Sequence, residues 1–123
     1  MRLAGRVALV TGSSSGIGRG VALAFASEGA DVVINHPTAA ETAAAEQVAA
    51  AVRQAGRRAL VVRADVSQEA EVERLVAAAR DAFGHIDILV NNAGIAAAAA
   101  VHEMTTETWD RVLGVHLRGT FMM

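Results

Sequence analysis

Short apolar runs alternate along the chain with longer segments in which apolar residues recur at helical spacing. The runs at residues 7–10, 32–34, 59–62 and 86–90 are apolar at nearly every position and rich in Val, Leu and Ile. Such runs are typical of strands that are buried on both faces of a parallel sheet. The pattern therefore predicts four strands, each followed by a helix.

Four apolar stripes define the expected helices, and a glycine follows each of the first three. Helix ends are favoured at Gly29, Gly56 and Gly84, because glycine adopts the left-handed conformation that often terminates a helix. The predicted stripes are Ile17, Val21, Ala24 and Phe25; Ala45, Val48, Ala49 and Val52; Val72, Leu75, Val76, Ala79 and Phe83; and Trp109, Val112, Leu113, His116 and Leu117.

Polar residues before three of these stripes predict where the helices begin. Residues 38–41, with the sequence Thr-Ala-Ala-Glu, match a capping box for the second helix. Ser67 is expected to cap the third helix, and Thr105 or Thr106 to open the last one. The resulting order, β-α-β-α-β-α-β-α, predicts one α/β domain over residues 1–123, a doubly wound parallel sheet with strand order 3-2-1-4.

A glycine- and serine-rich loop joins the first strand to the first helix. It reads Thr-Gly-Ser-Ser-Ser-Gly-Ile-Gly over residues 11–18. Glycines let a backbone approach a ligand closely, and a helix N-terminus offers unpaired N–H groups that attract anions. We expect a phosphate-binding loop here, with a plain strand-to-helix turn as the alternative. No Lys follows the glycines, so the loop is not a P-loop.

Composition excludes several kinds of chemistry. The chain has no Cys and no Tyr, and all 11 of its Lys and Arg residues are Arg. Disulfide and thiolate chemistry are thereby excluded, as is any reaction that needs a phenol or an amine side chain from this chain. The net charge of -2 gives no reason to expect a nucleic-acid partner. No apolar segment approaches the roughly 20 residues that span a bilayer, and the expected location is cytoplasmic.

Three motifs at strand ends resemble those of the classical short-chain dehydrogenases/reductases. Besides the glycine loop, Asp65-Val66 follows the third strand and Asn91-Asn92-Ala93-Gly94 follows the fourth. The resemblance covers essentially the whole chain and implies a Rossmann-like fold that binds NAD or NADP. It implies that Asp65 accepts from the adenine amino group, that Val66 contacts the ring and that Asn91 contacts a ribose. The remaining expected cofactor-binding residues are Gly12, Ser14, Ser15, Gly16, Ile17, Gly18, Asn35, His36, Ala93 and Gly94.

The end of the second strand bears on the choice between NAD and NADP. An acid there would bind the ribose hydroxyls of NAD, but Asn35 and His36 are neutral. In the family a basic residue that meets the 2′-phosphate of NADP often precedes the second glycine, where this chain has Ser15. The missing acid favours NADP slightly, and the choice stays open.

His116 stands where the family has an Asn that supports the active site through a water. Its place on the apolar stripe predicts an inward side chain, either hydrogen-bonded in the core or functional. The four histidines show no spacing typical of metal ligands, and no metal is expected.

The family transfers a hydride between nicotinamide and an alcohol or carbonyl carbon, using a Tyr, a Lys and a Ser that normally lie beyond the last helix seen here. We therefore expect an incomplete cofactor-binding portion of an enzyme acting on a secondary alcohol, ketone, sugar or 3-oxoacyl group, with no turnover by this chain alone. The alternative is a non-catalytic nucleotide-binding module. An open fourth strand and a shortened last helix predict low stability as a monomer and self-association, including homo-oligomers.

Overall fold

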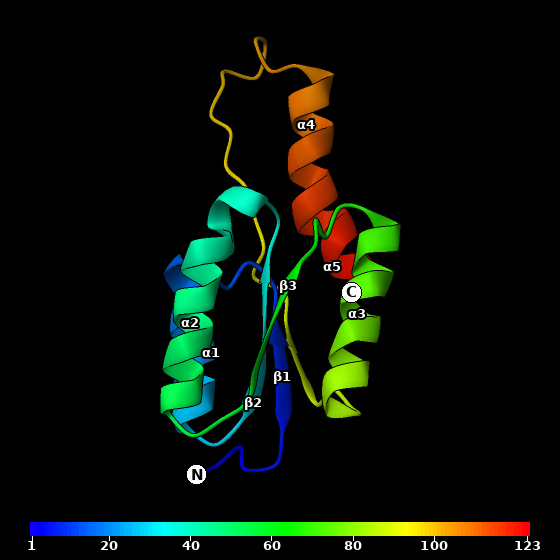
Figure 1. The fold of residues 1–123 in the computed structure, drawn as a ribbon. Helices are drawn as coiled ribbons and strands as arrows, with labels where there is room; N and C mark the ends of the chain where they lie inside the picture. The colour runs from blue at the N-terminus through cyan, green and yellow to red at the C-terminus, as the bar shows by residue number, and fades with distance from the viewer.

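Four parallel strands in the order β3-β2-β1-β4 run through the middle of the structure (Figure 1). The computed structural model describes residues 1–123 throughout. The order confirms the topology expected from the sequence. The elements are β1 (Val7–Val10), α1 (Gly16–Ser27), β2 (Asp31–His36), η1, a 3₁₀ turn (Ala39–Glu41), α2 (Thr42–Gln54), β3 (Ala59–Arg63), α3 (Glu69–Phe83), β4 (Ile88–Val90), α4 (Thr106–Leu113), η2, a π-helical segment (Gly114–Arg118), and α5 (Gly119–Met122).

The register of the sheet brings the carboxyl ends of its strands to one edge. Val10, the last residue of β1, lies opposite Ile34 of β2 and Val90 of β4. His36 of β2 lies opposite Arg63 of β3. In a sheet of this topology the order reverses between β1 and β4, and ligands bind outside the carboxyl ends at that point.

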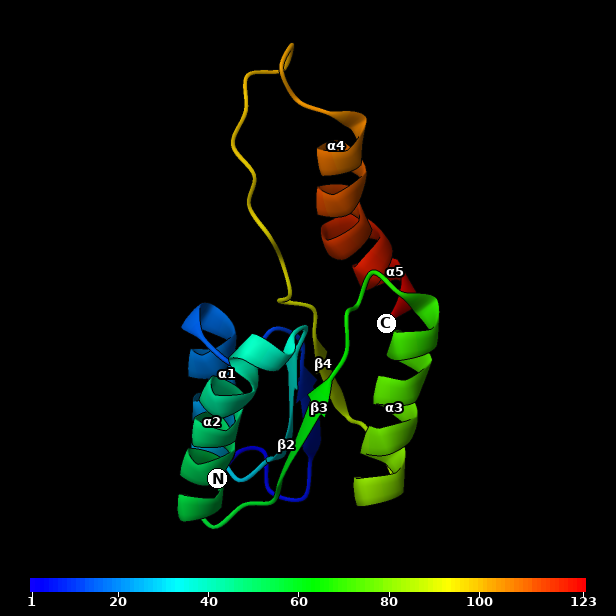
Figure 2. The same ribbon diagram turned by 45° about the horizontal axis from the view of Figure 1, so that its top comes forward.

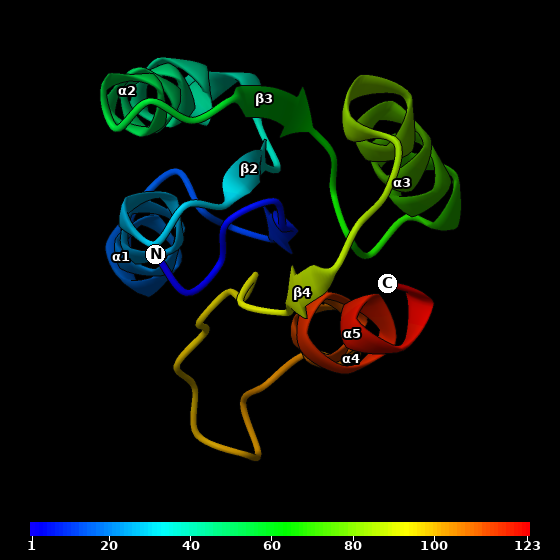
Figure 3. The same ribbon diagram turned by 90° about the horizontal axis from the view of Figure 1, so that it is seen from below.

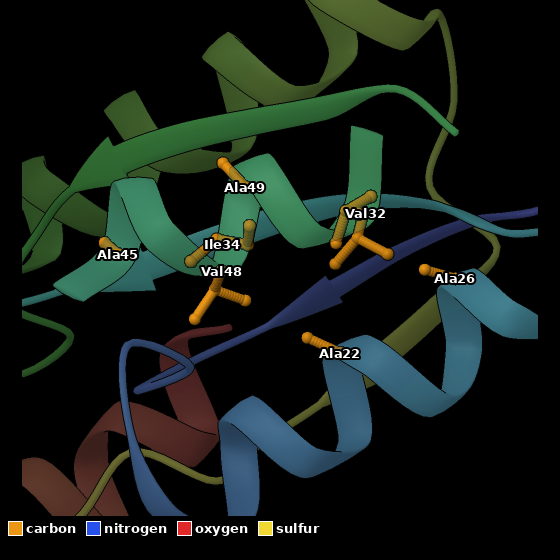
Figure 4. Close-up of a cluster of buried hydrophobic side chains, with 8 residues drawn as sticks. Ala22, Ala26, Val32, Ile34, Ala45, Val48 and Ala49 are labelled. Atoms are coloured by element: carbon orange, nitrogen blue, oxygen red, sulfur yellow. The ribbon is translucent and has the colours of Figure 1, made fainter. Parts of the chain in front are cut away.

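Helices cover both faces of the sheet (Figure 3). Helices α1 and α2 pack on one face, where Val32 and Ile34 of β2 meet small residues of both helices (Figure 4). Helix α3 packs on the other face, where Leu75 contacts Val7, Leu9 and other strand residues. Alternate strand residues therefore serve two separate cores, and this explains why the strands are apolar on both faces.

The predicted stripes of α2 and α3 are confirmed, whereas that of α1 is wrong for Ile17 and Ala24, and Phe25 packs partly buried against the core. In α2 the four predicted residues are all buried. In α1 the buried residues are Gly18, Ala22 and Ala26, whereas Ile17 is 80% exposed. Small residues face the sheet because the backbone of α1 lies very close to it. A Cβ on Gly18 would overlap the carbonyl oxygen of Gly12.

Two of the three predicted helix starts differ in detail. Thr38 donates to a carboxylate oxygen of Glu41 at 2.9 Å, but this bond spans η1, which Thr38 precedes and Glu41 ends. Helix α2 begins only at Thr42, without a side-chain cap. Ser67 donates to Asp65 instead of capping α3, which begins at Glu69. Thr105 does cap α4, because its hydroxyl accepts from the N–H of Thr108 at 3.1 Å.

The last helical segment leaves the body of the sheet and is largely exposed. The chain runs out from β4 through residues 91–105 and returns along α4, η2 and α5 (Figure 2). The apolar stripe expected to face inward lies instead on the surface, since only Gly119 is buried in this segment. The fourth strand is also shorter than predicted, with Ile86 and Asp87 outside it. None of the helices has both the length and the apolarity needed to cross a membrane.

Candidate functional site

The glycine loop after β1 is held in place by the loop after β4. Thr11 accepts through its hydroxyl from the N–H groups of Asn92 and Ala93, at 3.0 and 2.9 Å. The amide of Asn92 donates back to the carbonyls of Thr11 and Gly12, at 3.1 and 3.0 Å. Gly12 has φ of +62°, and a Cβ there would lie 2.9 Å from the Cα of Ala93. The two loops therefore pack backbone against backbone, with no room for a side chain.

Asn92 was not among the predicted cofactor-binding residues, although it lies within the motif at residues 91–94. The sequence feature that could have indicated its role is its place as the second Asn at the end of a strand, because the two N–H groups of an amide can donate to two carbonyls at once. Its neighbour Asn91 is exposed and lies outside the pocket described below.

The side chain of Asn35 forms a second set of hydrogen bonds, which joins the same loop to β2 and β3. The buried Asn35 accepts from the N–H of Gly12 at 3.1 Å and donates to the carbonyls of Val62 and Ala64, at 3.2 and 3.0 Å. Ser13 adds to these bonds, since its hydroxyl accepts from the N–H of Asn35 at 3.1 Å and donates to a carbonyl of β1. Both donors of the Asn35 amide are thus used inside the protein.

His36 is also turned inward. It is 1% exposed, and its Nδ1 lies 2.7 Å from the carbonyl oxygen of Thr38. Because a carbonyl oxygen only accepts, Nδ1 carries the proton and donates. The sequence predicts cofactor ligands at Asn35 and His36, but both side chains instead bond to the protein. The strand-end position was visible in the sequence, whereas the direction of the side chains was not.

The first turn of α1 leaves backbone N–H groups free. Ser15 stands at the N-cap but makes no side-chain bond to the helix. The N–H groups of Ile17 and Gly18 have no acceptor in the protein, as expected for an uncapped helix start. Gly16 has φ of +58°, and a Cβ there would meet no atom within 4 Å. Free donors, a helix N-terminus and open space together fit a phosphate group.

Asp65 is half-buried beside the N-terminus of α3. Its Oδ1 accepts from both the N–H and the hydroxyl of Ser67, at 2.9 and 2.7 Å. Its own N–H donates to Glu71 at 3.1 Å. The second carboxylate oxygen of Asp65 has no donor in the protein and is available to accept from a ligand.

A pocket of ≈ 470 Å³ lies over the carboxyl edge of the sheet. This volume is in the usual range for small-molecule sites. The pocket brings together eight of the predicted cofactor residues from the ends of all four strands. They are Gly12, Ser14, Ser15, Asn35, Asp65, Val66, Ala93 and Gly94. Its lining does not include five others, namely Gly16, Ile17, Gly18, His36 and Asn91.

Several pocket residues were not predicted. Pro37, Thr38 and Glu41 come from the segment after β2, and Arg111 comes from α4. The remaining additions are Ala64, Ser67, Asn92, Ile95 and Val115. Arg111 is the only cationic side chain in the lining, whereas Glu41 and Asp65 contribute two carboxylates.

His116 contacts the loop after β4 and does not line the pocket. Its Nε2 lies 3.1 Å from the backbone N and 2.8 Å from the carbonyl oxygen of Ile95. A Cβ on Gly94 would lie 3.0 Å from the same Nε2, so the ring packs closely against a glycine. His116 is exposed and not buried as predicted, because the last helix has no further layer to cover it. No group of three or more His, Asp and Glu side chains is arranged to bind a metal.

Two relatives resemble the chain in sequence over nearly its full length. An uncharacterized oxidoreductase of Methylorubrum extorquens is 44% identical over 121 residues, 98% of this chain and 48% of that protein. Hydroxyacyl-CoA dehydrogenase ChsB1 of Mycobacterium tuberculosis is 43% identical over 123 residues, 98% of this chain and 38% of that protein. The chain thus spans about half, or less, of the length of the relatives that it matches.

Solved structures and a family model agree with these relatives. A blue fluorescent protein from a metagenomic library, in complex with NADPH, has a TM-score of 0.95 at 34% identity and covers 99% of this chain and 49% of that one. A short chain dehydrogenase from Burkholderia cenocepacia, in complex with NADP, has a TM-score of 0.94 at 41% identity, with the same coverage of 99% and 49%. The model of the short chain dehydrogenase family matches residues 6–123. The chain therefore belongs to the short-chain dehydrogenase family.

Proposed function

We propose that this chain binds NAD or NADP across the carboxyl edge of its sheet and is the cofactor-binding part of an NAD(P)-dependent oxidoreductase. The observation that carries the proposal is the uncapped start of α1. There the N–H groups of Ile17 and Gly18 lack acceptors, and a Cβ on Gly16 would meet no atom within 4 Å. Backbone donors at a helix N-terminus are the usual site of a pyrophosphate in such sheets.

The order of the strands supports a placement for the rest of the dinucleotide. From the loop after β1, the adenosine extends across β2 toward β3, where Asp65 accepts from the adenine amino group and Val66 packs against the ring. The other half extends toward β4, where Ala93 and Gly94 leave the backbone accessible and Asn91 contacts the ribose. Nicotinamide supplies hydride chemistry when it is bound, and these residues of the chain only bind and orient it.

The sequence-based preference for NADP is part of this proposal. It is supported by the two relatives solved with NADPH and NADP and by the neutral end of β2. The substrate stays open among secondary alcohols, ketones, sugars and 3-oxoacyl groups. A cytoplasmic location stays a prediction, which fractionation of the producing cells tests.

A second function, nucleotide binding without catalysis, is favoured by one observation. The chain contains neither Tyr nor Lys. A positioned acid or base typically contributes about 10²–10⁴-fold to a rate. We therefore expect binding of a dinucleotide without oxidation of NADPH by carbonyl compounds. Turnover by the 123-residue chain would favour the enzyme over the binding module.

Titration of the chain with NADH and NADPH, followed by cofactor fluorescence, tests the site. Gly16→Ala adds a Cβ next to the free donors at the start of α1 and strains a residue with positive φ, which costs roughly 1–2 kcal/mol. We expect the Kd to rise at least about tenfold. Gly20→Ala is the matched control, because Gly20 lies inside α1 with open space around it. It should leave the Kd unchanged and raise stability by up to about 1 kcal/mol. Equal Kd values for Gly16→Ala and the parent chain would contradict the proposal.

We also propose that the chain self-associates. The strand β4 is an open edge of the sheet, and four large apolar residues recur every four positions along the exposed last helical segment. They are Trp109, Leu113, Leu117 and Phe121, which are 57%, 37%, 67% and 86% exposed. Sedimentation velocity should show association that Leu117→Glu weakens and that Ala50→Glu, on the exposed face of α2, does not. A monomer at all concentrations would contradict this proposal.

A further inference from the structure

The pocket contains a carboxylate close to the end of β2, although the strand itself ends without an acid. Glu41 is half-buried in η1 and lines the pocket together with Pro37 and Thr38. Its position between the glycine loop after β1 and Asp65 after β3 is where the adenosine ribose of the proposed cofactor would lie. The charge at this point decides how the pocket receives a 2′-hydroxyl or a 2′-phosphate.

Glu41 is held in place by a chain of hydrogen bonds that begins in the core. The buried His36 donates through Nδ1 to the carbonyl oxygen of Thr38 at 2.7 Å. The hydroxyl of Thr38 donates to Oε2 of Glu41 at 2.9 Å, and the N–H of Glu41 donates to the carbonyl of Thr38 at 3.2 Å. The carboxylate is therefore oriented by its neighbours, and Oε1 has no donor in the protein.

No cation at this end of the pocket offsets Glu41. Arg111, the only cationic residue of the lining, comes from α4 and also lines the adjoining depression with Asp65, Ser67 and Gln68. Arg19, on α1, is exposed and does not line the pocket. A phosphate of up to two negative charges would thus meet a fixed carboxylate with no guanidinium beside it.

We propose that Glu41 is the residue that determines cofactor specificity in this pocket, accepting a hydrogen bond from the ribose 2′-hydroxyl of NAD and opposing the 2′-phosphate of NADP. The inference rests on the proposed cofactor site. The negative charge of Glu41 acts against the preference for NADP that the neutral end of β2 suggests. The acid is supplied by η1 and not by β2 itself. His36 and Thr38 then act as positioning residues.

The test compares the Kd values of NADH and NADPH for the full chain and three variants. Glu41→Gln keeps the acceptor for Thr38 but removes the charge, and Glu41→Arg reverses it. Unit charges about 4 Å apart interact by about 1 kcal/mol in water and more near a protein surface. We therefore expect NADPH to bind about five- to tenfold more tightly to Glu41→Gln and more tightly still to Glu41→Arg. NADH should bind equally or more weakly. Glu46→Gln, on the exposed face of α2, is the matched control for loss of a negative charge and should change neither Kd.

Ionic strength provides a second readout. Salt screens exposed charges over about 10 Å at 0.1 M, so the gain for NADPH in Glu41→Gln should shrink as salt is added. Equal changes for NADH and NADPH, or no change for either, would overturn the specificity role while leaving the cofactor site standing. Failure of the parent chain to bind either dinucleotide would overturn both the site and this inference.

Discussion

Asn35→Asp is a single-atom change that separates a structural role from a ligand role at the end of β2. An acid at this position would serve the ribose of NAD if the side chain pointed into the pocket. In the structure, the Asn35 amide instead donates to the carbonyls of Val62 and Ala64. The substitution would turn a carboxylate oxygen toward both carbonyls, so we expect lower stability and no tighter binding of NAD.

The magnitude follows from the two hydrogen bonds. Each buried acceptor that loses its donor costs about 1–3 kcal/mol, so the change should cost about 2–6 kcal/mol before any cost of burying the new charge. A domain of this size has a total stability of about 5–15 kcal/mol, and Asn35 is 1% exposed. The variant should therefore unfold at a much lower urea concentration, or fail to accumulate as folded protein.

Urea denaturation followed by far-UV circular dichroism measures this loss. Gln47→Glu, an amide-to-acid change on the exposed face of α2, is the matched control and should shift the free energy of unfolding by less than about 0.5 kcal/mol. Asn35→Leu removes the same two donors without adding charge, but it also removes the acceptor of the Gly12 N–H, so the difference between the two variants measures the cost of the buried charge against that one bond. The reasoning is refuted if Asn35→Asp is as stable as the parent chain and binds NADH more tightly.

Two further predictions concern other parts of the molecule. Burial acts to raise the pKa of Asp31, but hydrogen bonds from Arg58 and the charges of Arg57 and Arg58 outweigh it and hold the pKa below its ordinary value. Folding therefore favours the carboxylate, and Asp31→Asn should lower the free energy of unfolding by about 1–3 kcal/mol at pH 7. In urea titrations, the difference in stability between the parent chain and the variant should shrink as the pH falls below about 4, because the carboxylate is then protonated. A difference that persists unchanged at low pH would contradict this. Gly94→Ala should free residues 91–105 from the last helix, because its Cβ would overlap the His116 ring, and hydrogen exchange in this loop should accelerate. Addition of His116→Ala should remove the overlap but not restore the hydrogen bonds between His116 and Ile95. Unchanged exchange in both variants would show that His116 does not hold this loop.

The sequence predicted the strand order and the buried faces of α2 and α3, because the valine and leucine residues of these helices recur at helical spacing. It failed for Ile17 and Ala24 of α1, a helix in which nearly every residue is apolar and periodicity carries little information. There, the close approach of the backbone to the sheet selects Gly18 and Ala22 for the buried face. Whether a buried position needs a small or a large side chain depends on neighbours that are distant in the sequence, and a local pattern of apolar residues does not show this.

The site was predicted in its location but not in its details. Strand ends marked by Gly12, Asp65 and Gly94 do meet at one pocket, since parallel strands share an edge. Asn35 and His36 were expected to face a ligand, yet they satisfy backbone groups of the protein itself, which no local pattern reveals. Glu41 was interpreted only as part of a helix cap, because its proximity to the pocket depends on how η1 folds back.

The back-to-back contact of Gly12 with Ala93, fixed by the amide of Asn92, has a consequence for protein engineering. Segments 80 residues apart in the sequence are joined so closely that neither can change shape without the other. We expect chimaeras that import only the first loop from a relative to lose cofactor affinity, even when the imported glycines are identical. Exchange of both loops together should preserve cofactor affinity. The two loops must therefore be transferred as a pair, because the glycine motif alone does not carry the site.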